Sequence, residues 1–349
     1  MKIAFILPSL VKTGPIIFTK NLIEGLNKHC INVEIEVLYL KNIKEIDFNV
    51  KCTHISFFNS SGLNKFDIVL STMLRPDLFT YFHRKKIKNR VISFHNFIRE
   101  DLFFLYGFPF SLILYQFWKK SFYNCDSFIC SSSFQKEYYS NYIKIKDIIS
   151  IIPYGIPEQK LAVLEKNIEL ELLDFCENHK IIGSCGSLIK RKGFDIIINS
   201  LKKLKDYKLI IIGEGPEKQN LINLSKKLDV DKRVLFIDFT DKYASYYKFF
   251  DVYALSSKSE GFGLAMLEAI RQGKPILISN LEIYKDFMSV KKVVFFNPES
   301  QNSFENSIED IFNNLEYYSK ESIKLYNDFF SLKKMAESHF SLFQKLLLK

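Results

Sequence analysis

The chain has 349 residues and a formal net charge of +10; 47% of the residues are hydrophobic and 25% are charged. This balance excludes a disordered or fibrous chain, and the length suits two globular domains that each bury a core. The six cysteines form no C-x-x-C pair, so they predict buried thiols in a reducing cytoplasm instead of a disulfide framework or a metal cluster.

The positive charge lies mainly in the first half of the chain. Residues 1–150 contain 20 basic and 12 acidic side chains, and the remainder is close to neutral. A basic half suits an anionic partner, such as nucleic acid, anionic lipid headgroups or a lipid pyrophosphate. A lysine-rich source proteome explains the excess equally well, so the charge by itself does not identify a partner.

The first 152 residues alternate between apolar runs and amphipathic segments, which predicts an α/β domain. The opening run 2–7 is a strand and not a signal peptide, because its apolar stretch is short and no small-residue cleavage site follows. No G-x-G-x-x-G follows this strand, which disfavours a dinucleotide site. A helix is predicted at 15–29. Gly14 therefore lies in a strand-to-helix turn at the sheet edge where α/β proteins bind ligands.

Two later strand ends carry polar side chains. His95 comes directly after the apolar run 91–94, and Arg75 and Asp77 follow the predicted strand 67–71. Because the C-terminal ends of parallel strands face the ligand crevice, all three side chains are candidates for a functional site. The alternative for His95 is a strand-end histidine that is capped by a neighbouring loop.

The most apolar segment of the chain is 102–118, which Gly107 and Pro109 interrupt. It is too short and too broken for a spanning helix. A helix at about 109–123 has an aromatic face and ends in basic residues, a composition that suits contact with a membrane surface. The alternative is an amphipathic helix that packs on the sheet.

A hinge is predicted at 153–157, where PYGIP places two prolines and a glycine in five residues. The α/β pattern then starts again, which predicts a second domain at 153–331. Its first strand leads into the basic loop GSLIKRKG at 186–193, directly before a helix. Cationic side chains beside a helix N-terminus suit a pyrophosphate. Gly213 begins a further glycine-rich turn after the strand 209–212.

The segment 251–279 is predicted to form a strand, a loop, a helix and a second strand. Gly261 and Gly263 bracket Phe262 in the loop, and the helix begins at Leu264. Glycines in such a loop allow close approach to a ligand, and the free N–H groups of the helix end bind phosphate.

Two carboxylates mark this segment. Glu260 lies just before the helix and Glu268 lies inside it. A carboxylate can accept two hydrogen bonds from a vicinal diol, so the pair suits a nucleotide sugar whose phosphates bind the helix end. The alternative is that both are solvated surface charges.

The sequence SEGFGLAMLEAIRQGKPIL at 259–277 is similar to the E-x7-E signature of the retaining glycosyltransferases of family 4. The resemblance implies the GT-B fold, in which two Rossmann-like doubly wound domains are separated by a cleft. It also implies that a C-terminal helix at about 332–349 crosses back to the first domain. The reaction it implies moves a sugar from a nucleotide diphosphate sugar with retention, without a cofactor or a metal ion.

The resemblance assigns roles to the basic loop. The family loop reads G-R-L-x-x-x-K-G, and its Arg and Lys hold the donor pyrophosphate. Lys192 matches the family Lys, Ser187 stands where Arg is commonest, and Arg191 supplies a further positive charge. The family also commonly has I-P-N-G-I-D at the hinge, where Tyr154 and Pro157 depart from the pattern, and we expect neither departure to touch the chemistry.

The remaining roles follow in the same way. His95, followed by Asn96, matches a family His that lies near the transferred sugar, while Glu260 corresponds to the residue that holds this sugar and Glu268 to the one that binds ribose. Arg75 and Asp77 are the candidate acceptor contacts. The other donor-binding candidates belong to the turns that face the phosphates: Gly14, Gly213, Gly261, Phe262, Gly263 and Leu264.

The predicted function is therefore transfer of a sugar from a UDP- or GDP-linked donor to a hydroxyl of a glycan or lipid-linked acceptor. The expected pathway is the synthesis of a bacterial surface polysaccharide, such as capsule, O-antigen or lipopolysaccharide. The expected location is the cytoplasm, with peripheral contact to the inner membrane and no nucleic acid partner. The alternatives are a non-catalytic subunit of the same fold, a nucleotide-sugar 2-epimerase and, from charge alone, a nucleic-acid-binding protein.

Overall fold

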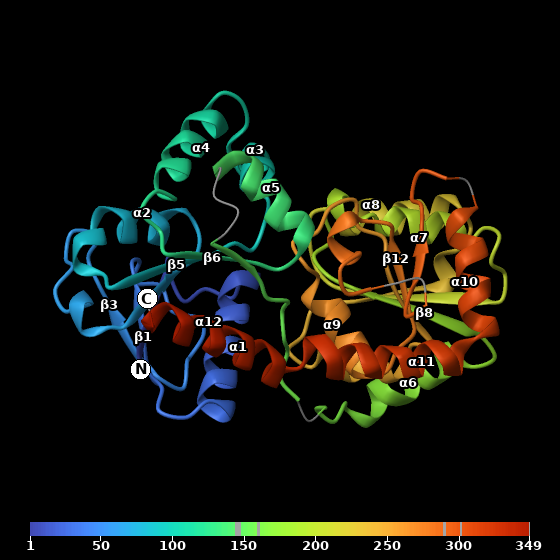
Figure 1. Ribbon diagram of the computed structural model, residues 1–349. Helices are drawn as coiled ribbons and strands as arrows, with labels where there is room; N and C mark the ends of the chain where they lie inside the picture. Colours follow the sequence, from blue (N-terminus) through green and yellow to red (C-terminus); the bar gives the residue numbers. More distant parts are fainter. Residues whose placement is uncertain (144–147, 159–160, 289–290, 301, 349) are drawn as a thin grey trace. The chain divides into compact units, whose positions relative to one another are not determined.

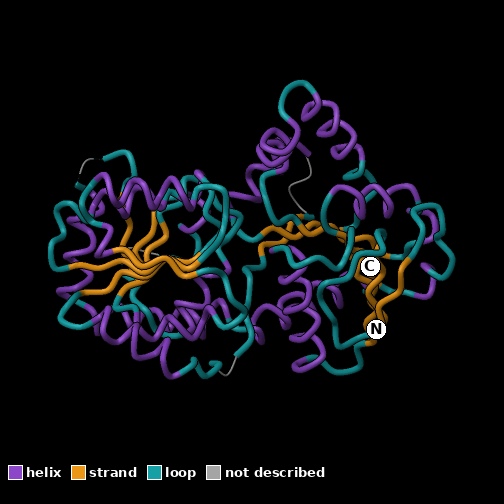
Figure 2. The backbone as a smooth tube through the Cα atoms, turned by 180° about the vertical axis from the view of Figure 1, so that it is seen from behind, coloured by secondary structure: helices purple, strands orange, loops and turns teal. Residues whose placement is uncertain are grey.

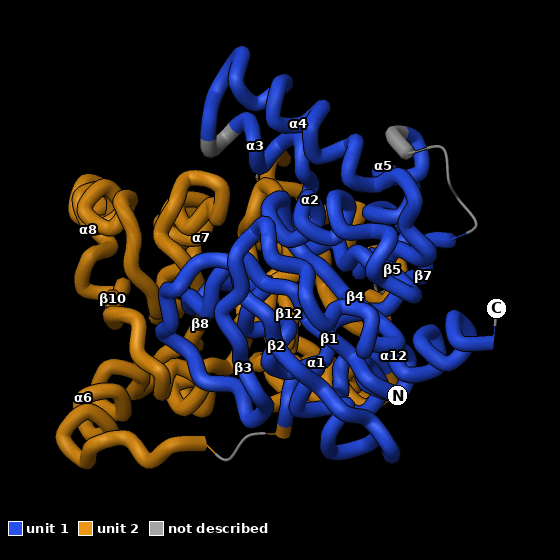
Figure 3. Tube along the Cα trace, turned by 90° about the vertical axis from the view of Figure 1, so that its left-hand side faces the viewer, with its two compact units in different colours: residues 1–157, 329–349 blue, residues 158–328 orange. Residues whose placement is uncertain are grey.

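The computed structural model describes residues 1–143, 148–158, 161–288, 291–300 and 302–348. The chain divides into two compact units, each with its own sheet (Figure 3). Unit 1 contains residues 1–157 and 329–349, and unit 2 contains residues 158–328. The boundaries predicted from the sequence, after residues 152 and 331, lie a few residues from these positions.

Unit 1 is built on a seven-stranded parallel sheet in the order β3-β2-β1-β4-β5-β6-β7 (Figure 1). Its strands are β1 (Lys2–Leu7), β2 (Glu34–Tyr39), β3 (Lys51–His54), β4 (Ile68–Ser71), β5 (Asn89–Ser93), β6 (Ser127–Cys130) and β7 (Ile149–Ile151). Its described α-helices are α1 (Gly14–His29), α2 (Leu74–Phe82), α3 (Ile98–Tyr106), α4 (Phe110–Lys120), α5 (Ser133–Ile143) and α12 (Leu332–Leu347).

Unit 2 has a six-stranded parallel sheet in the order β10-β9-β8-β11-β12-β13. Its strands are β8 (Lys180–Cys185), β9 (Tyr207–Ile212), β10 (Val234–Ile237), β11 (Val252–Leu255), β12 (Ile276–Ser279) and β13 (Val294–Phe296). Its described α-helices are α6 (Lys166–Cys176), α7 (Phe194–Ser200), α8 (Lys218–Lys227), α9 (Leu264–Arg271), α10 (Ser303–Asn313) and α11 (Leu315–Leu325).

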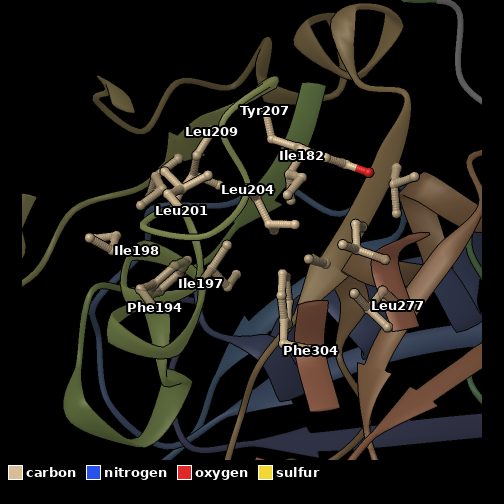
Figure 4. Close-up of a cluster of buried hydrophobic side chains, with 14 of the residues drawn as sticks. Ile182, Phe194, Ile197, Ile198, Leu201, Leu204, Tyr207, Leu209, Leu277 and Phe304 are labelled. Atoms are coloured by element: carbon tan, nitrogen blue, oxygen red, sulfur yellow. The ribbon is translucent and has the colours of Figure 1, made fainter. Parts of the chain in front are cut away.

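Both sheets have helices on each of their faces, as the view from behind shows (Figure 2). The central strands therefore read as continuous apolar runs, because neither face of a covered parallel strand meets water. In β1 every residue from Ile3 to Leu7 is buried. In unit 2 the strand residues Ile182 and Leu209 pack with Ile197 of α7 and Phe304 of α10 in one core cluster (Figure 4).

The strand order reverses once in each sheet, between β1 and β4 in unit 1 and between β8 and β11 in unit 2. Adjacent loops part at such a switch point, so the C-terminal edge there is the usual ligand site of an open α/β sheet. The predicted architecture of two Rossmann-like domains is confirmed.

The C-terminal helix α12 packs against α1 within unit 1. Gly25 of α1 permits the contact, because a Cβ atom there would lie 3.0 Å from the Cβ atom of Ala336. The bridge between Ile156 and Ser331 ties the entrance of α12 to the predicted hinge segment.

Two local expectations from the sequence differ from the structure. The apolar alternation at 52–58 suggests a strand that in fact ends at His54, and the helical pattern at 242–249 forms a 3-10 helix at Tyr243–Phe249. The predicted break in the apolar segment 102–118 is confirmed, because α3 ends before Gly107 and α4 covers most of the helix predicted at about 109–123. Gly107 ends α3 with a φ of 64°, a conformation that favours glycine, and Pro109 precedes the new helix.

Candidate active site

An ion pair lies at the switch point of unit 2. Lys192, in the loop after β8, places its Nζ 2.5 Å from Oε1 of Glu260, in the loop after β11. Arg191 Nη1 lies 3.7 Å from the other carboxylate oxygen. Glu260 is only 5% exposed, and the Ser257 hydroxyl donates to its Oε1 at 2.6 Å. The structure thus brings together Lys192, Arg191 and Glu260, three of the predicted site residues.

The backbone of the basic loop is held close to the end of β11. Gly193 has a φ of 65°, and a Cβ atom there would lie 2.2 Å from the carbonyl oxygen of Ser256. The Ser256 hydroxyl donates to the Gly193 carbonyl at 2.7 Å, and Arg191 Nη1 donates to the Ser259 carbonyl. Only glycine fits this position, so the loop that carries the cations has little freedom to move away from Glu260.

The N-terminus of α9 adds a favourable site for an anion. Gly263 caps the helix with a φ of 95°, and Leu264 is its first residue. Free N–H groups and the helix dipole at such an end attract phosphate. Phe262 is buried and its ring centroid lies 6.4 Å from that of Phe287, so its side chain packs inside the unit. Gly261 precedes it in the loop.

Glu268 lies inside α9 and is buried with Arg271 beside it. Its Oε2 is 2.7 Å from the Arg271 guanidinium, one turn further along the helix. Burial raises the pKa of Glu268, and the charge of Arg271 opposes this rise. Because Glu268 is buried, it is not the solvated surface charge considered as the alternative.

The two remaining donor candidates of unit 2 lie on neighbouring loops. Ser187 is exposed in the loop after β8. Gly213 follows β9, and a Cβ atom there would lie 2.0 Å from the carbonyl oxygen of Gly186. A side chain at Gly213 would therefore push the two loops apart.

Unit 1 has a cavity of about 230 Å³ at its own switch point. Residues at the C-terminal ends of β1, β4 and β5 contribute to its wall, and α3 and α4 supply apolar and aromatic groups. The lining residues are Pro8, Pro15, Thr72, Met73, Leu74, Arg75, Ser93, Phe94, His95, Asn96, Ile98, Asp101, Leu102, Tyr106, Trp118 and Tyr139. We call this cavity the unit 1 pocket.

His95 is a buried, uncharged member of the unit 1 pocket. It is 7% exposed, and burial, with a smaller contribution from His339, lowers its pKa to about 3. Its Nδ1 lies 2.5 Å from the hydroxyl oxygen of Tyr154. The expectation that Tyr154 lies away from the chemistry is therefore wrong, because the polypeptide folds the hinge segment against the end of β5. A strand-end histidine was visible in the sequence, but its distant partner was not.

The two acceptor candidates of unit 1 lie in different environments. Arg75 is exposed and lines the pocket. Asp77 is 1% exposed; its carboxylate accepts hydrogen bonds from Ser71 at 2.7 Å and from Trp118 Nε1 at 2.8 Å. Burial raises the pKa of Asp77 to about 7. Both of its oxygens are used inside the unit, so its geometry indicates a structural role and argues against the predicted acceptor contact.

Two further residues of unit 1 bear on the site. Gly14 is exposed at the first position of α1, with open space around it. Met73 precedes α2 with a φ of 74° and a ψ of 160°, a conformation found almost only at glycine, and it lines the pocket. Sequence reasoning missed Met73, because nothing in its residue type indicates a strained backbone.

Among the residues that the structure describes, carboxylate, imidazole and thiol groups do not cluster in a way that suits a metal ion. Across the described ranges, no set of three or more His, Cys, Asp and Glu side chains could hold one. The donor set around Glu260 is cationic, which suits an anionic ligand and not a cation.

Comparison with known proteins gives consistent results. A family model described as "Glycosyl transferases group 1" matches residues 168–324. An O-antigen biosynthesis glycosyltransferase, WclY from Escherichia coli, is 31% identical, and the match covers 99% of each chain.

Solved structures share the fold. The chain is similar to Anabaena Alr3699/HepE in complex with UDP, with a TM-score of 0.80 at 14% identity over 99% of this chain and 100% of that one. It is also similar to the apo form of the lipopolysaccharide outer core galactosyltransferase WaaB, with a TM-score of 0.76 at 18% identity and the same coverage.

Proposed function

The chain belongs to the glycosyl transferases group 1 family, and we propose that it moves a sugar from a UDP- or GDP-linked donor to a hydroxyl of a lipid-linked surface glycan. We further propose that the anomeric configuration is retained, as the E-x7-E pattern of Glu260 and Glu268 suggests. WclY is an O-antigen biosynthesis glycosyltransferase, which supports an acceptor of the same class. The solved HepE complex contains UDP, which makes UDP the first nucleotide to test.

The observation that carries the donor assignment is the pairing of Lys192 and Glu260 at the switch point of unit 2. A departing nucleoside diphosphate gains negative charge, and a fixed cation beside a helix N-terminus stabilises that charge. Lys192 and Arg191 supply the cations, with α9 behind them. Glu260 positions both cations and then holds hydroxyl groups of the donor sugar, while Glu268 binds the ribose.

The acceptor assignment is based on the unit 1 pocket. Aromatic walls suit the apolar face of a sugar ring, and His95 and Arg75 offer polar contacts to its hydroxyl groups. His95 contacts the sugars at the reaction centre, and Arg75 holds an anionic or hydroxyl group of the acceptor further out.

An exposed apolar surface on α3 and α4 supports contact of unit 1 with a membrane. Within the residues that the structure describes, no helix combines the length and apolar character needed to cross a bilayer. Lys119 and Lys120 end α4 and suit anionic headgroups. Phe108 is 75% exposed at the tip. The exposed apolar side chains, which we call the hairpin surface, are Phe103, Tyr106, Phe108, Phe110, Leu112, Ile113 and Phe117.

Thermal unfolding in the presence of UDP, GDP, ADP or CMP tests the donor assignment. At 100 times its dissociation constant, the correct nucleotide should raise the free energy of unfolding by about 2.7 kcal/mol, which is a few degrees in the midpoint. Glu268→Gln should lose this response. Glu316→Gln, which removes an exposed carboxylate paired with Lys320, should keep it. If no nucleoside diphosphate raises the midpoint of the wild type, the donor assignment is wrong.

Flotation with vesicles tests the membrane contact. The double variant Phe108→Ser and Phe110→Ser should bind vesicles that contain phosphatidylglycerol at least about 10-fold more weakly than the wild type, because it loses the exposed apolar tip. Phe58→Ser removes an even more exposed aromatic ring elsewhere in unit 1 and should bind as the wild type does. Equal binding by all three proteins would exclude the hairpin surface as the contact.

A further inference from the structure

His95 belongs to a group of packed aromatic rings within unit 1. The ring of Phe18, from α1, lies 4.6 Å from that of His95 and 4.5 Å from that of Tyr154, measured between centroids. The ring of His339, from α12, lies 6.0 Å from Phe18. The side chains of His95, Phe18, Tyr154 and His339 are all buried. Segments far apart in the sequence therefore meet at the residue that the proposed function places at the reaction centre.

The backbone around Tyr154 is fixed by contacts with the start of α12. The N–H of Gly155 donates to the sulfur of Met335 at 3.1 Å, and the N–H of Ile156 donates to the carbonyl of Phe330 at 3.0 Å. A Cβ atom at Gly155 would lie 2.6 Å from the carbonyl oxygen of Ser331. Tyr154 therefore reaches His95 from a segment that has little room to shift.

In the hydrogen bond between His95 Nδ1 and the Tyr154 hydroxyl, either group can be the donor. The phenol O–H is a stronger donor than the N–H of a neutral imidazole, and an unprotonated imidazole nitrogen is a better acceptor than a phenol oxygen. The favoured arrangement is thus donation from the Tyr154 hydroxyl to Nδ1 of His95. A histidine that accepts at Nδ1 and is uncharged must carry its own proton on Nε2.

Burial supports the uncharged state on which this argument depends. Burial lowers the pKa of His95 to about 3 and that of His339 to about 4. His339 uses its own Nδ1 to contact the carbonyl oxygen of Met335 at 2.8 Å. Near neutral pH neither ring carries a charge that could exchange protons with the other.

The other edge of the His95 ring remains for a ligand. Nε2 is buried, and among the described residues it has no hydrogen-bond partner. His95 also lines the unit 1 pocket. A buried N–H without a partner is costly, and this cost falls when a ligand oxygen accepts the bond.

We propose that Tyr154 is a positioning residue that holds His95 in the Nε2–H tautomer, so that His95 meets the bound sugar as a hydrogen-bond donor and not as a base. This inference rests on the proposed function for the role of the sugar, but not for the tautomer. In this tautomer His95 has no lone pair at Nε2 and cannot take the proton that the acceptor hydroxyl loses during transfer. Another group must accept that proton. The departure from the family pattern at Tyr154 thereby gains a function.

Nitrogen NMR of the full chain with 15N-labelled histidine tests the proposal directly. The chain has six histidines, and comparison with His95→Gln identifies the ring signals that belong to His95. The wild type should show the Nε2–H tautomer with a hydrogen-bonded Nδ1. In Tyr154→Phe, the Nδ1 signal should move towards that of a free imine nitrogen. Tyr318→Phe removes another buried hydroxyl, which contacts Asp310 in unit 2, and should leave the signal unchanged.

Two NMR results would overturn the proposal. One is an Nδ1–H tautomer in the wild type, which needs no variant and so does not depend on folding of Tyr154→Phe. The other is an unchanged Nδ1 signal in a folded Tyr154→Phe protein, with the His339 signal as the internal check of folding.

Kinetics separate this inference from the proposed function. With the nucleotide sugar that corresponds to the stabilising nucleoside diphosphate, Tyr154→Phe should lower kcat about 10-fold and leave the KM for the donor within about twofold. Full activity in His95→Gln would show that His95 has no role in the reaction, but it would not affect the NMR evidence on the tautomer. Full activity in Tyr154→Phe, with His95→Gln impaired, would overturn the positioning role alone.

Discussion

The two switch points of the molecule share one sheet architecture but differ in electrostatics, because one is built from charged side chains and the other from aromatic and uncharged ones. In unit 2 the site consists of charged side chains that are already paired, with Lys192 and Arg191 on Glu260. In unit 1 the corresponding edge has an aromatic pocket in which His95 is uncharged, and the buried Asp77 accepts a hydrogen bond from Trp118 of the pocket wall. Both edges follow from parallel strands whose order reverses.

The difference matches the ligands proposed for each unit. A pyrophosphate is an anion whose charge rises during the reaction, so a fixed cation is most useful where it binds. A sugar hydroxyl is neutral, and a pocket that combines aromatic walls with polar side chains can select it by shape and by hydrogen bonds. The ion pair in unit 2 also keeps the cations positioned before a ligand arrives, because Glu260 is buried and needs a partner.

The largest effect is expected from Lys192→Ala, which removes the central cation of unit 2. The rate of sugar transfer should fall roughly 10²–10³-fold, the range seen when one group that stabilises developing negative charge is removed. The measurement is kcat/KM for the nucleotide sugar. Lys248→Ala is the matched control, because Lys248 pairs with Glu169 elsewhere in unit 2. Equal losses in both variants would show that Lys192 acts only through stability.

The charged site could be predicted from the sequence, and the neutral one only in part. Glu260, Glu268 and Lys192 lie in local motifs whose spacing follows from a strand, a loop and a helix. The parallel α/β pattern was likewise local, since buried strands and amphipathic helices each show their own period. Spacing within a short motif survives folding, so these residues could be found without knowing the tertiary structure.

The features that were missed depend on distant parts of the chain. The contact of Tyr154 with His95 joins positions 59 residues apart. Asp77 stood at a plausible strand end, yet Trp118 on α4 and Ser71 on β4 take both of its oxygens. The strained backbone of Met73 is a property of the loop and not of the residue type. Such features require the packed structure.

The next largest effect is expected from acid, which should lower the stability of unit 1 more than that of unit 2. Unit 1 buries His339 and His95, whereas the only histidine of unit 2 is the partly exposed His179. The pKa of His339 in the folded state is about 4, below its unfolded value of about 6.5. Its contribution to stability is thus fully present above pH 6.5 and is lost as the pH falls towards 4. From pH 7 to pH 5 this loss is about 2 kcal/mol.

The variant His339→Gln tests this expectation by urea unfolding at pH 7 and pH 5. Its free energy of unfolding should fall about 2 kcal/mol less than that of the wild type over this interval. Asp77 acts in the opposite direction, since its raised pKa of about 7 destabilises the fold as the pH rises through 4 to 7. Both proteins share that effect, so the difference isolates His339. The exposed His54→Gln is the control, and identical slopes in all three proteins would contradict the prediction.

The smallest effect concerns strain at the unit 1 pocket and compares two substitutions of Met73. At an ordinary position, a protein with Gly is less stable than one with Ala by about 0.5–1 kcal/mol, because the glycine backbone gains more conformational freedom on unfolding. Met73 has a φ of 74°, where Ala keeps a strain of about 1–3 kcal/mol that Gly releases. Met73→Gly should therefore be more stable than Met73→Ala by about 1 kcal/mol in urea unfolding. Because both variants lose the same thioether side chain, only the backbone separates them. If Met73→Ala were instead more stable than Met73→Gly, the backbone at Met73 would carry no strain. The sites of units 1 and 2 would then differ in charge alone.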